Sequence, residues 1–217
     1  MGRRQHSQGT GRTEIASRAA RLLADGEADG FDSARRKAAR ELGAEHSREQ
    51  PDNLELQRAL IAYLQLFHGV AQVAHITHLR SLALKVLRLL APFQPVLVGP
   101  VLYGTARGFT PISVHLRCDE FEAVTRFLLE RRMIYQLVDT QLRLSGVGAP
   151  QRAVKIALTL YNEAFELMVL PVNNTRQPIS AIDGKPMRRA DEAALEALLD
   201  SGVIFTGDPA GRAAVGR

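Results

Sequence analysis

The sequence contains a single cysteine, Cys118, which excludes both a disulfide framework and a cluster of thiolate metal ligands. It also contains no Asp or Glu between Glu55 and Asp119. A Walker loop, a dinucleotide-binding fingerprint, a zinc-ligand set and the residue order of a Ser-His-Asp triad are absent as motifs. The enzyme classes that these motifs define are therefore not indicated, and the lone cysteine favours a reducing, bacterial-type cytoplasm.

The sequence gives no sign of a secretory signal or of a membrane segment. Its first residues, MGRRQHSQGTGR, lack the apolar run of a signal peptide. The most apolar region, residues 81–104, is interrupted by the charged side chains of Lys85 and Arg88 and by three prolines. We therefore expect a cytoplasmic protein without a membrane partner.

Basic residues exceed acidic ones, 28 to 23, for a formal net charge of +5. A cationic surface favours nucleic-acid binding because phosphate counterions are released. Part of the excess lies in residues 1–12, a polar segment rich in Gly, Ser and Gln that we expect to be disordered. A second basic cluster consists of Arg35, Arg36, Lys37 and Arg40. It is either a nucleic-acid handle or an ordinary solvated helix face.

Apolar residues at helical spacing predict an amino-terminal helical region over residues 13–91. We expect short helices at residues 14–23 and 33–42. Asp52 and Glu55 have the spacing of a capping box and predict the start of a third helix, which Gly69 should end. A fourth helix is expected over residues 73–91, before Pro92.

After Pro95 the pattern changes to short strands, which predicts an α+β core over residues 92–200. The expected strands cover residues 96–103, 112–118, 135–138, 141–144, 153–160 and 165–170. The turn Tyr161-Asn162-Glu163-Ala164 predicts that the last two form a hairpin. Expected helices cover 119–132, capped by Asp119, and 191–199. Residues 201–217 should form a flexible tail.

A strand, a Gly-Thr turn, an alternating strand and a helix together resemble the nucleotidyltransferase fold of the DNA polymerase beta superfamily. Over residues 13–199 the stretches LVGPVLYGTA, VHL, FELMVLP and DGKPMRRA resemble an uncharacterised proteobacterial nucleotidyltransferase-like family. The resemblance implies a mixed β-sheet with helices packed on it and an amino-terminal helical extension. It also implies a phosphate-binding turn and carboxylates from two strands that hold two Mg²⁺ ions.

The chain departs from this pattern where the carboxylates should be. The paired acids of the second strand would fall near Pro111 and Ser113, and neither position is acidic. Only the later acid has a counterpart, Glu166. Because Mg²⁺ prefers anionic oxygen ligands, we expect conventional two-metal transfer to be absent or very weak. We therefore predict no metal ligand and no cofactor. Mg²⁺ is the metal ion that the resemblance implies.

Two candidate sites remain. Alternation places Ser113, His115 and Glu166 on one face of the expected sheet, where His115 and Glu166 could act as an acid–base pair, because a nearby carboxylate raises the pKa of an imidazole. The alternative is that both are ordinary strand residues. Backbone donors and a guanidinium suffice to bind a phosphate. This site would comprise Gly104, Thr105 and Arg107, unless they form a plain turn.

Arg188 and Arg189 precede the last expected helix, where the helix dipole disfavours cations. These two arginines are therefore expected either to bind an anionic ligand or to pair with a neighbouring acidic side chain. Three functions follow from these observations. The first is a degenerate scaffold, a pseudoenzyme, that binds a nucleotide or a partner protein. The second is an active nucleotidyltransferase with an atypical site around Glu166. The third is RNA or DNA binding by the basic amino-terminal helices.

Overall fold

The computed structural model describes residues 4–108, 110–145, 148–173 and 176–206 of the chain. These residues form two compact units. The first comprises residues up to Gln72 together with 181–183, and the second comprises 73–180 and 184–206. The division falls inside a long helix, whereas the sequence led us to expect a boundary at Ala91. The later part of that helix belongs to the hydrophobic core of the second unit.

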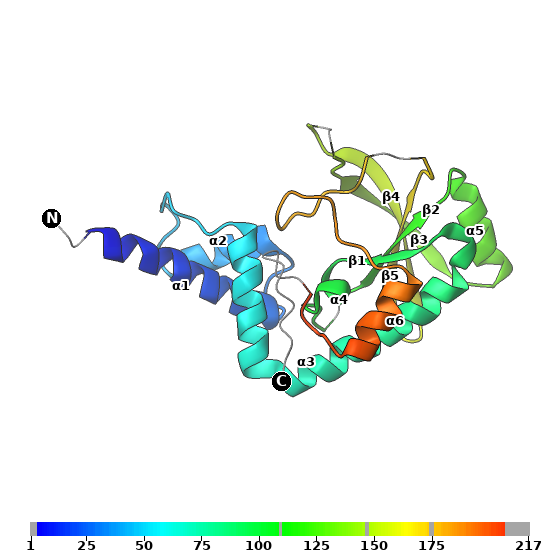
Figure 1. Cartoon of the computed structure of the whole chain (residues 1–217). Helices are drawn as coiled ribbons and strands as arrows, with labels where there is room; N and C mark the ends of the chain where they lie inside the picture. The colour runs from blue at the N-terminus through cyan, green and yellow to red at the C-terminus, as the bar shows by residue number, and fades with distance from the viewer. Residues whose placement is uncertain (1–3, 109, 146–147, 174–175, 207–217) are drawn as a thin grey trace. The chain divides into compact units, whose positions relative to one another are not determined.

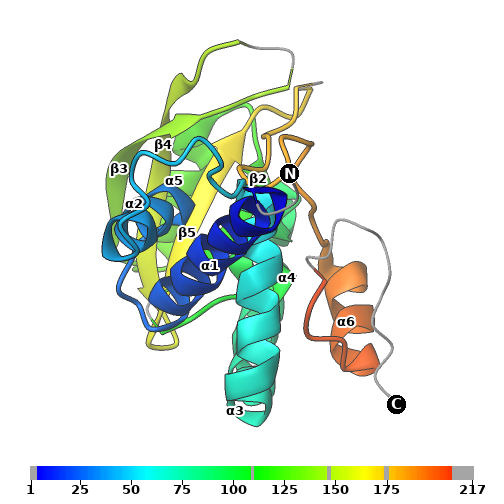
Figure 2. The same cartoon turned by 90° about the vertical axis from the view of Figure 1, so that its left-hand side faces the viewer.

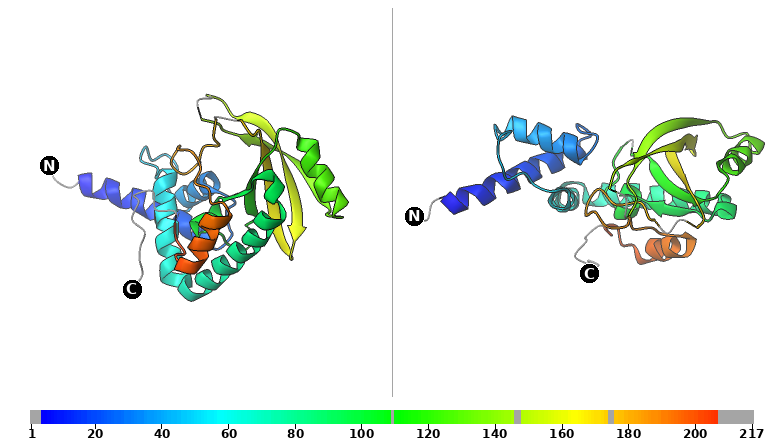
Figure 3. Two further views of the ribbon diagram at one scale, coloured as in Figure 1. Left: turned by 45° about the vertical axis from the view of Figure 1, so that its right-hand side comes forward. Right: turned by 90° about the horizontal axis from the view of Figure 1, so that it is seen from above.

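The first unit consists of α1 (Arg4–Ala24), α2 (Phe31–Glu41) and the part of α3 (Asn53–Leu89) up to Gln72. Figure 3, right, shows α1 and α2 side by side. Their small cluster buries Ile15, Ala16, Ala19, Leu22, Ala34, Ala38 and Leu56. Because α1 begins at Arg4, residues 4–12, which we expected to be disordered, are helical; residues 1–3 lie outside the described part.

The predicted capping box at the start of α3 is confirmed. The backbone N–H of Glu55 donates to Asp52 Oδ1 at 2.8 Å, and the N–H of Asp52 donates to Glu55 Oε2 at 2.7 Å. Arg12 on α1 donates to the same carboxylate, with Nη2 2.6 Å from Oε2. Hydrogen bonding to Arg12 lowers the pKa of Glu55. One carboxylate therefore caps α3 and ties it to α1.

The long helix α3 runs without interruption through Gly69, where we expected it to end. A single glycine costs an exposed helix only about 1 kcal/mol. The apolar side chains next to it, Phe67 and Val70, are exposed, but α3 is anchored before and after this stretch by the buried Leu64 and Ile76. Among the described residues, α3 is also the one helix that is long and apolar enough to cross a membrane. Only 22% of its most apolar window is buried, and one such helix is weak evidence for a membrane span. The cytoplasmic location therefore remains a prediction.

The second unit contains a mixed five-stranded sheet of order β1-β2-β5-β4-β3 (Figure 1). The strands are β1 (Val96–Val98), β2 (Ile112–Arg117), β3 (Tyr135–Leu142), β4 (Gln151–Leu160) and β5 (Glu163–Leu170). Only β2 and β5 pair in parallel. The α+β class is confirmed, and so is the β4–β5 hairpin. Figure 2 shows β3, β4 and β5 side by side; β3 is one strand, not the predicted pair.

The two faces of the sheet differ in character, as the alternation along β2 predicts. Ile112, Val114 and Leu116 are fully buried in the main core. They share this core with the later part of α3, with α5 (Phe121–Glu130) and with α6 (Glu192–Ser201), which Figure 3 shows beside the strands. The opposite face of β2 carries three partly exposed polar residues, Ser113, His115 and Arg117. Functional chemistry must therefore be sought on this second, polar face.

Asp119 was predicted to cap the helix that follows it, and this prediction is wrong, whereas no cap was predicted for the last helix. Asp191 caps α6 by accepting a hydrogen bond from the backbone N–H of Ala194 at 2.9 Å. Asp119 instead accepts from the N–H of Val172 at 2.9 Å, and the residue before α5 is Glu120, which makes no side-chain cap. In the tail expected after α6, residues 207–217 lie outside the described part of the chain.

The strand predicted over residues 96–103 is wrong after Val98. Gly99 has a φ of 76°, and Pro100 begins a short helix, α4 (Pro100–Tyr103). Proline lacks the N–H that a sheet ladder needs, and its fixed φ suits the first turn of a helix. The Gly-Thr turn therefore follows a helix and not a strand.

A fully buried arginine, Arg80 on α3, holds α4 in place. Its guanidinium donates to the carbonyl oxygens of Val101 at 3.2 Å and Leu102 at 2.8 Å. It also donates to the carbonyls of Val203 and Ile204, each at 2.6 Å. Burial lowers the pKa of Arg80 to about 10, so the side chain stays charged at neutral pH. The last carbonyl oxygens of a helix have no hydrogen-bond donor within it, and for α4 the Arg80 guanidinium provides these donors.

Replacing Arg80 by Met should destabilise the protein by about 3 kcal/mol or more, because several buried carbonyls lose their donor together. Arg80→Lys should recover only part of this loss, since an ammonium cannot reproduce the planar fork. Urea unfolding measures both. Arg126→Met, at an exposed position on α5, is the control. Equal stability of Arg80→Met and the control would contradict the role given to Arg80.

Candidate functional site

The Gly-Thr turn uses its own backbone donors. The N–H groups of Gly104, Thr105 and Ala106 all donate to the carbonyl oxygen of Pro100, the last two at 2.9 and 3.2 Å. The N–H of Arg107 donates to Thr110 Oγ1 at 2.9 Å. A phosphate bound here would need these same amides. The site predicted at Gly104, Thr105 and Arg107 therefore lacks available backbone donors in this structure.

Gly104 has a packing role that explains its identity. Its φ is 85°, in the region that favours glycine. A Cβ on Gly104 would lie 2.2 Å from the carbonyl oxygen of Ile204, one of the oxygens that Arg80 binds. The backbones of the turn and of residue 204 thus approach too closely for any side chain.

Gly104→Ala should lower the free energy of unfolding by several kcal/mol, because it combines a positive φ with a clash against backbone. Gly202→Ala is a matched control in the same unit. Its φ is 65°, but a Cβ there would meet nothing within 4 Å, so a loss of only about 1–2 kcal/mol is expected. Urea unfolding of both variants measures the difference. Equal losses would show that the approach to Ile204 does not matter.

Ser113, His115 and Glu166 lie on one face of the sheet, as predicted. In the parallel pairing of β2 and β5, Ser113 stands opposite Glu166, and His115 stands opposite Met168. The sequence did not identify the partner of Glu166. Lys155 on β4 places its Nζ 2.5 Å from Glu166 Oε1. Lys155 lies two residues before Ala157, which stands opposite Glu166, so the alternation of side chains along β4 could have placed this lysine on the polar face.

This ion pair decides what the Glu166 position can hold. The ammonium already compensates the carboxylate, and no other carboxylate joins it: in the described part of the chain, no group of three His, Cys, Asp or Glu residues is placed to hold a metal ion. Two Mg²⁺ ions need several anionic oxygens. The residues present do not fit them.

His115 is not the acid–base partner that we expected. Burial, and secondarily the positive charge of Arg189, lower its pKa from the usual 6.5 to about 4. The expectation was a pKa raised by Glu166, but that carboxylate stands opposite Ser113 and binds Lys155. His115 is therefore neutral at physiological pH.

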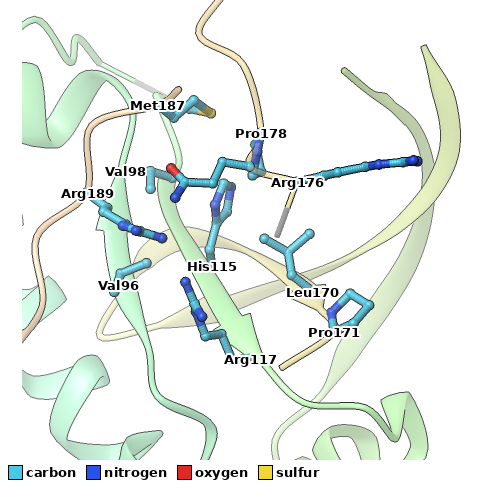
Figure 4. Close-up of a pocket in the computed structure, with 11 residues that line it drawn as sticks. Val96, Val98, His115, Arg117, Leu170, Pro171, Arg176, Pro178, Met187 and Arg189 are labelled. Atoms are coloured by element: carbon cyan, nitrogen blue, oxygen red, sulfur yellow. The ribbon is translucent and has the colours of Figure 1, made fainter. Parts of the chain in front are cut away.

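A small pocket surrounds His115 on the polar face (Figure 4). In Figure 4 the side chains of Arg117 and Arg189 point toward His115, whereas Arg176 extends away from it. The other residues that line the pocket are Val96, Val98, Leu170, Pro171, Gln177, Pro178 and Met187. No carboxylate is among the described residues that line it. The pocket is therefore cationic.

The two arginines predicted to bind an anion have different surroundings. Arg189 lines the pocket. Arg188 instead donates to the backbone carbonyl of Thr206 and is not a lining residue. Arg117 was not predicted as a site residue, although it follows His115 on the polar side of β2. Its proximity to Arg189 is a result of the tertiary fold alone.

The basic cluster on α2 is partly neutralised within the first unit. Arg35 pairs with Asp32 at 3.2 Å, and Lys37 pairs with Glu27 at 2.6 Å. Arg36 remains exposed, as does Arg40. The helix thus presents fewer uncompensated charges to a nucleic acid than its sequence suggests.

Comparisons with protein-family models, with curated proteins and with solved structures give no match for this chain. The α+β class and the mixed five-stranded sheet are established by the structure itself. The nucleotidyltransferase-like resemblance is a hypothesis that rests on the residues quoted for it.

The depressed pKa of His115 predicts a pH dependence of stability. The unfolded chain binds a proton near pH 6.5, whereas the folded protein resists it until about pH 4, so stability falls as the pH falls between these values. This contribution is on the order of 3 kcal/mol. Urea unfolding at pH 7, 6, 5 and 4.5 should show a smaller acid loss for His115→Gln than for wild type. The exposed His46, replaced in the same way, should leave the wild-type profile unchanged; equal profiles for all three proteins would refute the assignment.

Proposed function

We propose that the second unit is a nucleotidyltransferase-like scaffold that binds a nucleotide through its phosphates without two-metal transfer. The observation that carries this proposal is the Lys155–Glu166 ion pair, 2.5 Å long, at the one position where the resemblance retains an acid. A lysine ammonium supplies there the positive charge that a metal ion would otherwise bring. If the ammonium of Lys155 stands in place of a metal ion, the site would lose metal-dependent catalysis but keep a face that can bind anions.

The arrangement of the strands supports the same proposal. The resemblance implies that the second strand and a later acid-bearing strand are neighbours, and β2 and β5 pair in parallel with Ser113 opposite Glu166. The face that these residues share also carries His115 and Arg117. Positive charge on this face favours an anionic ligand, because bidentate guanidinium bonds to phosphate are among the strong hydrogen bonds of proteins.

Calorimetric titration with ATP, CTP and GTP tests the proposal. At least one nucleotide should bind, and its Kd should change less than about threefold between Mg²⁺ and EDTA, because Lys155 already neutralises Glu166. Failure of every nucleotide to give heat or a thermal shift would remove nucleotide binding.

A labelling assay separates this function from an active enzyme. With nucleotides labelled at the α-phosphate, wild type and Glu166→Gln should transfer no label to protein, RNA or small acceptors. Metal-dependent transfer by wild type that Glu166→Gln abolishes would instead establish the alternative, a transferase with an atypical site around Glu166.

A further inference from the structure

We propose that the pocket formed by His115, Arg117 and Arg189 is a metal-independent site for a phosphate group, either free inorganic phosphate or the terminal phosphate of a larger ligand. That the larger ligand is a nucleotide rests on the proposed function, whereas the phosphate site itself does not depend on it. It lies away from the Gly-Thr turn that precedes β2, because His115 and Arg117 occupy the second half of that strand.

The backbone holds the two arginines in fixed positions. His115 and Arg117 are alternate residues of β2, about 7 Å apart along the strand. Arg189 precedes Ala190, whose N–H and carbonyl both pair with Leu97 of β1, at 3.0 and 2.7 Å. Two different elements of the sheet thus direct guanidinium groups toward one imidazole (Figure 4). The Arg117 guanidinium also donates to the carbonyl oxygen of Val172 at 3.5 Å, a long hydrogen bond that a bound phosphate would share or replace.

The chemistry of the lining selects an oxyanion. Apolar side chains, among them Val96, Val98 and Met187, surround the charged groups and lower the local dielectric, which strengthens their attraction for an anion. The lining holds no carboxylate to compete for the guanidinium donors. A neutral His115 still offers one N–H donor, and the Gln177 amide offers another. A cation would meet only repulsion here.

The size of the pocket limits which part of a ligand can enter. Its volume is about 30 Å³. Pockets that enclose whole small molecules measure several hundred Å³. The pocket around His115 has about the volume that one water molecule occupies in liquid water. The enclosed space can therefore take one oxygen of a phosphate, whose other oxygens would lie at the open mouth of the pocket, and it cannot enclose a base or a sugar. A nucleotide would insert an oxygen of its terminal phosphate and leave the remainder on the open surface.

Titration of the full chain with inorganic phosphate, pyrophosphate and ATP, all in EDTA, tests the site. Arg189→Ala should weaken phosphate binding at least tenfold, and Arg117→Ala should do the same. Arg189→Lys should retain part of the affinity, since it keeps the charge but loses the fork. Arg188→Ala is the matched control: it removes the same charge one residue away, outside the lining. Thermal unfolding verifies that each variant is folded.

The arms of this experiment separate the two proposals. Weaker phosphate and ATP binding in Arg189→Ala would support a terminal phosphate of a nucleotide. Phosphate binding that depends on Arg189, without any ATP binding, would support the site for free phosphate and reject the nucleotide function. ATP binding that is equal in Arg189→Ala and Arg188→Ala, with no binding of inorganic phosphate to the wild type, would overturn the site and leave the nucleotide function standing.

A second readout does not depend on affinity. Bound phosphate should raise the pKa of His115 from about 4, because a nearby anion favours the imidazolium. Among the other charged groups that line the pocket, Arg117, Arg176 and Arg189, it is Arg189 that lowers this pKa in the free protein. Proton NMR titration of the imidazole in the presence and absence of phosphate measures the shift. An unchanged pKa at saturating phosphate would place the anion elsewhere.

Discussion

The guanidinium of Arg80, buried on α3, donates to four backbone carbonyls of the second unit, two at the end of α4 and two in the segment after α6. These bonds join three stretches of chain that are distant in the sequence. They bring the carbonyl of Ile204 against the turn so closely that only glycine fits at position 104. The turn then folds its amides back onto Pro100, a few residues before β2 begins at Ile112. The position of the polar strand face depends on this buried, fully hydrogen-bonded charge.

On that face, two features argue for binding over catalysis. Glu166 is neutralised by Lys155 from the adjacent strand, so the one acid that the resemblance retains has a cation within its own sheet. His115 is kept neutral by burial and by Arg189. A neutral imidazole, two guanidinium groups and no carboxylate form a poor site for divalent ions and a good one for an oxyanion. Within the part of the chain that the structure describes, no further metal ligand joins Glu166, which agrees with the electrostatics of the proposed pocket.

Local signals predicted a substantial part of the structure. The capping box at Asp52 and Glu55 and the β4–β5 hairpin depend on neighbouring residues, and both are confirmed. Predictions failed where packing outweighed local preference. Gly69 does not end α3, because one glycine costs only about 1 kcal/mol and the helix is anchored farther out by the buried Leu64 and Ile76. Asp119 does not cap α5, since its carboxylate binds the N–H of Val172, which is remote in the sequence.

The sequence by itself determined the lack of carboxylates between Glu55 and Asp119 and the alternation that places Ser113, His115 and Arg117 on one side of β2, because both are properties of residue order. Only the tertiary structure decided which partner each polar group has. The parallel pairing of β2 with β5 sets Glu166 beside Ser113, and the bridge between Leu97 and Ala190 brings Arg189 to His115. Those contacts join residues that are far apart in the chain, so no local pattern could encode them.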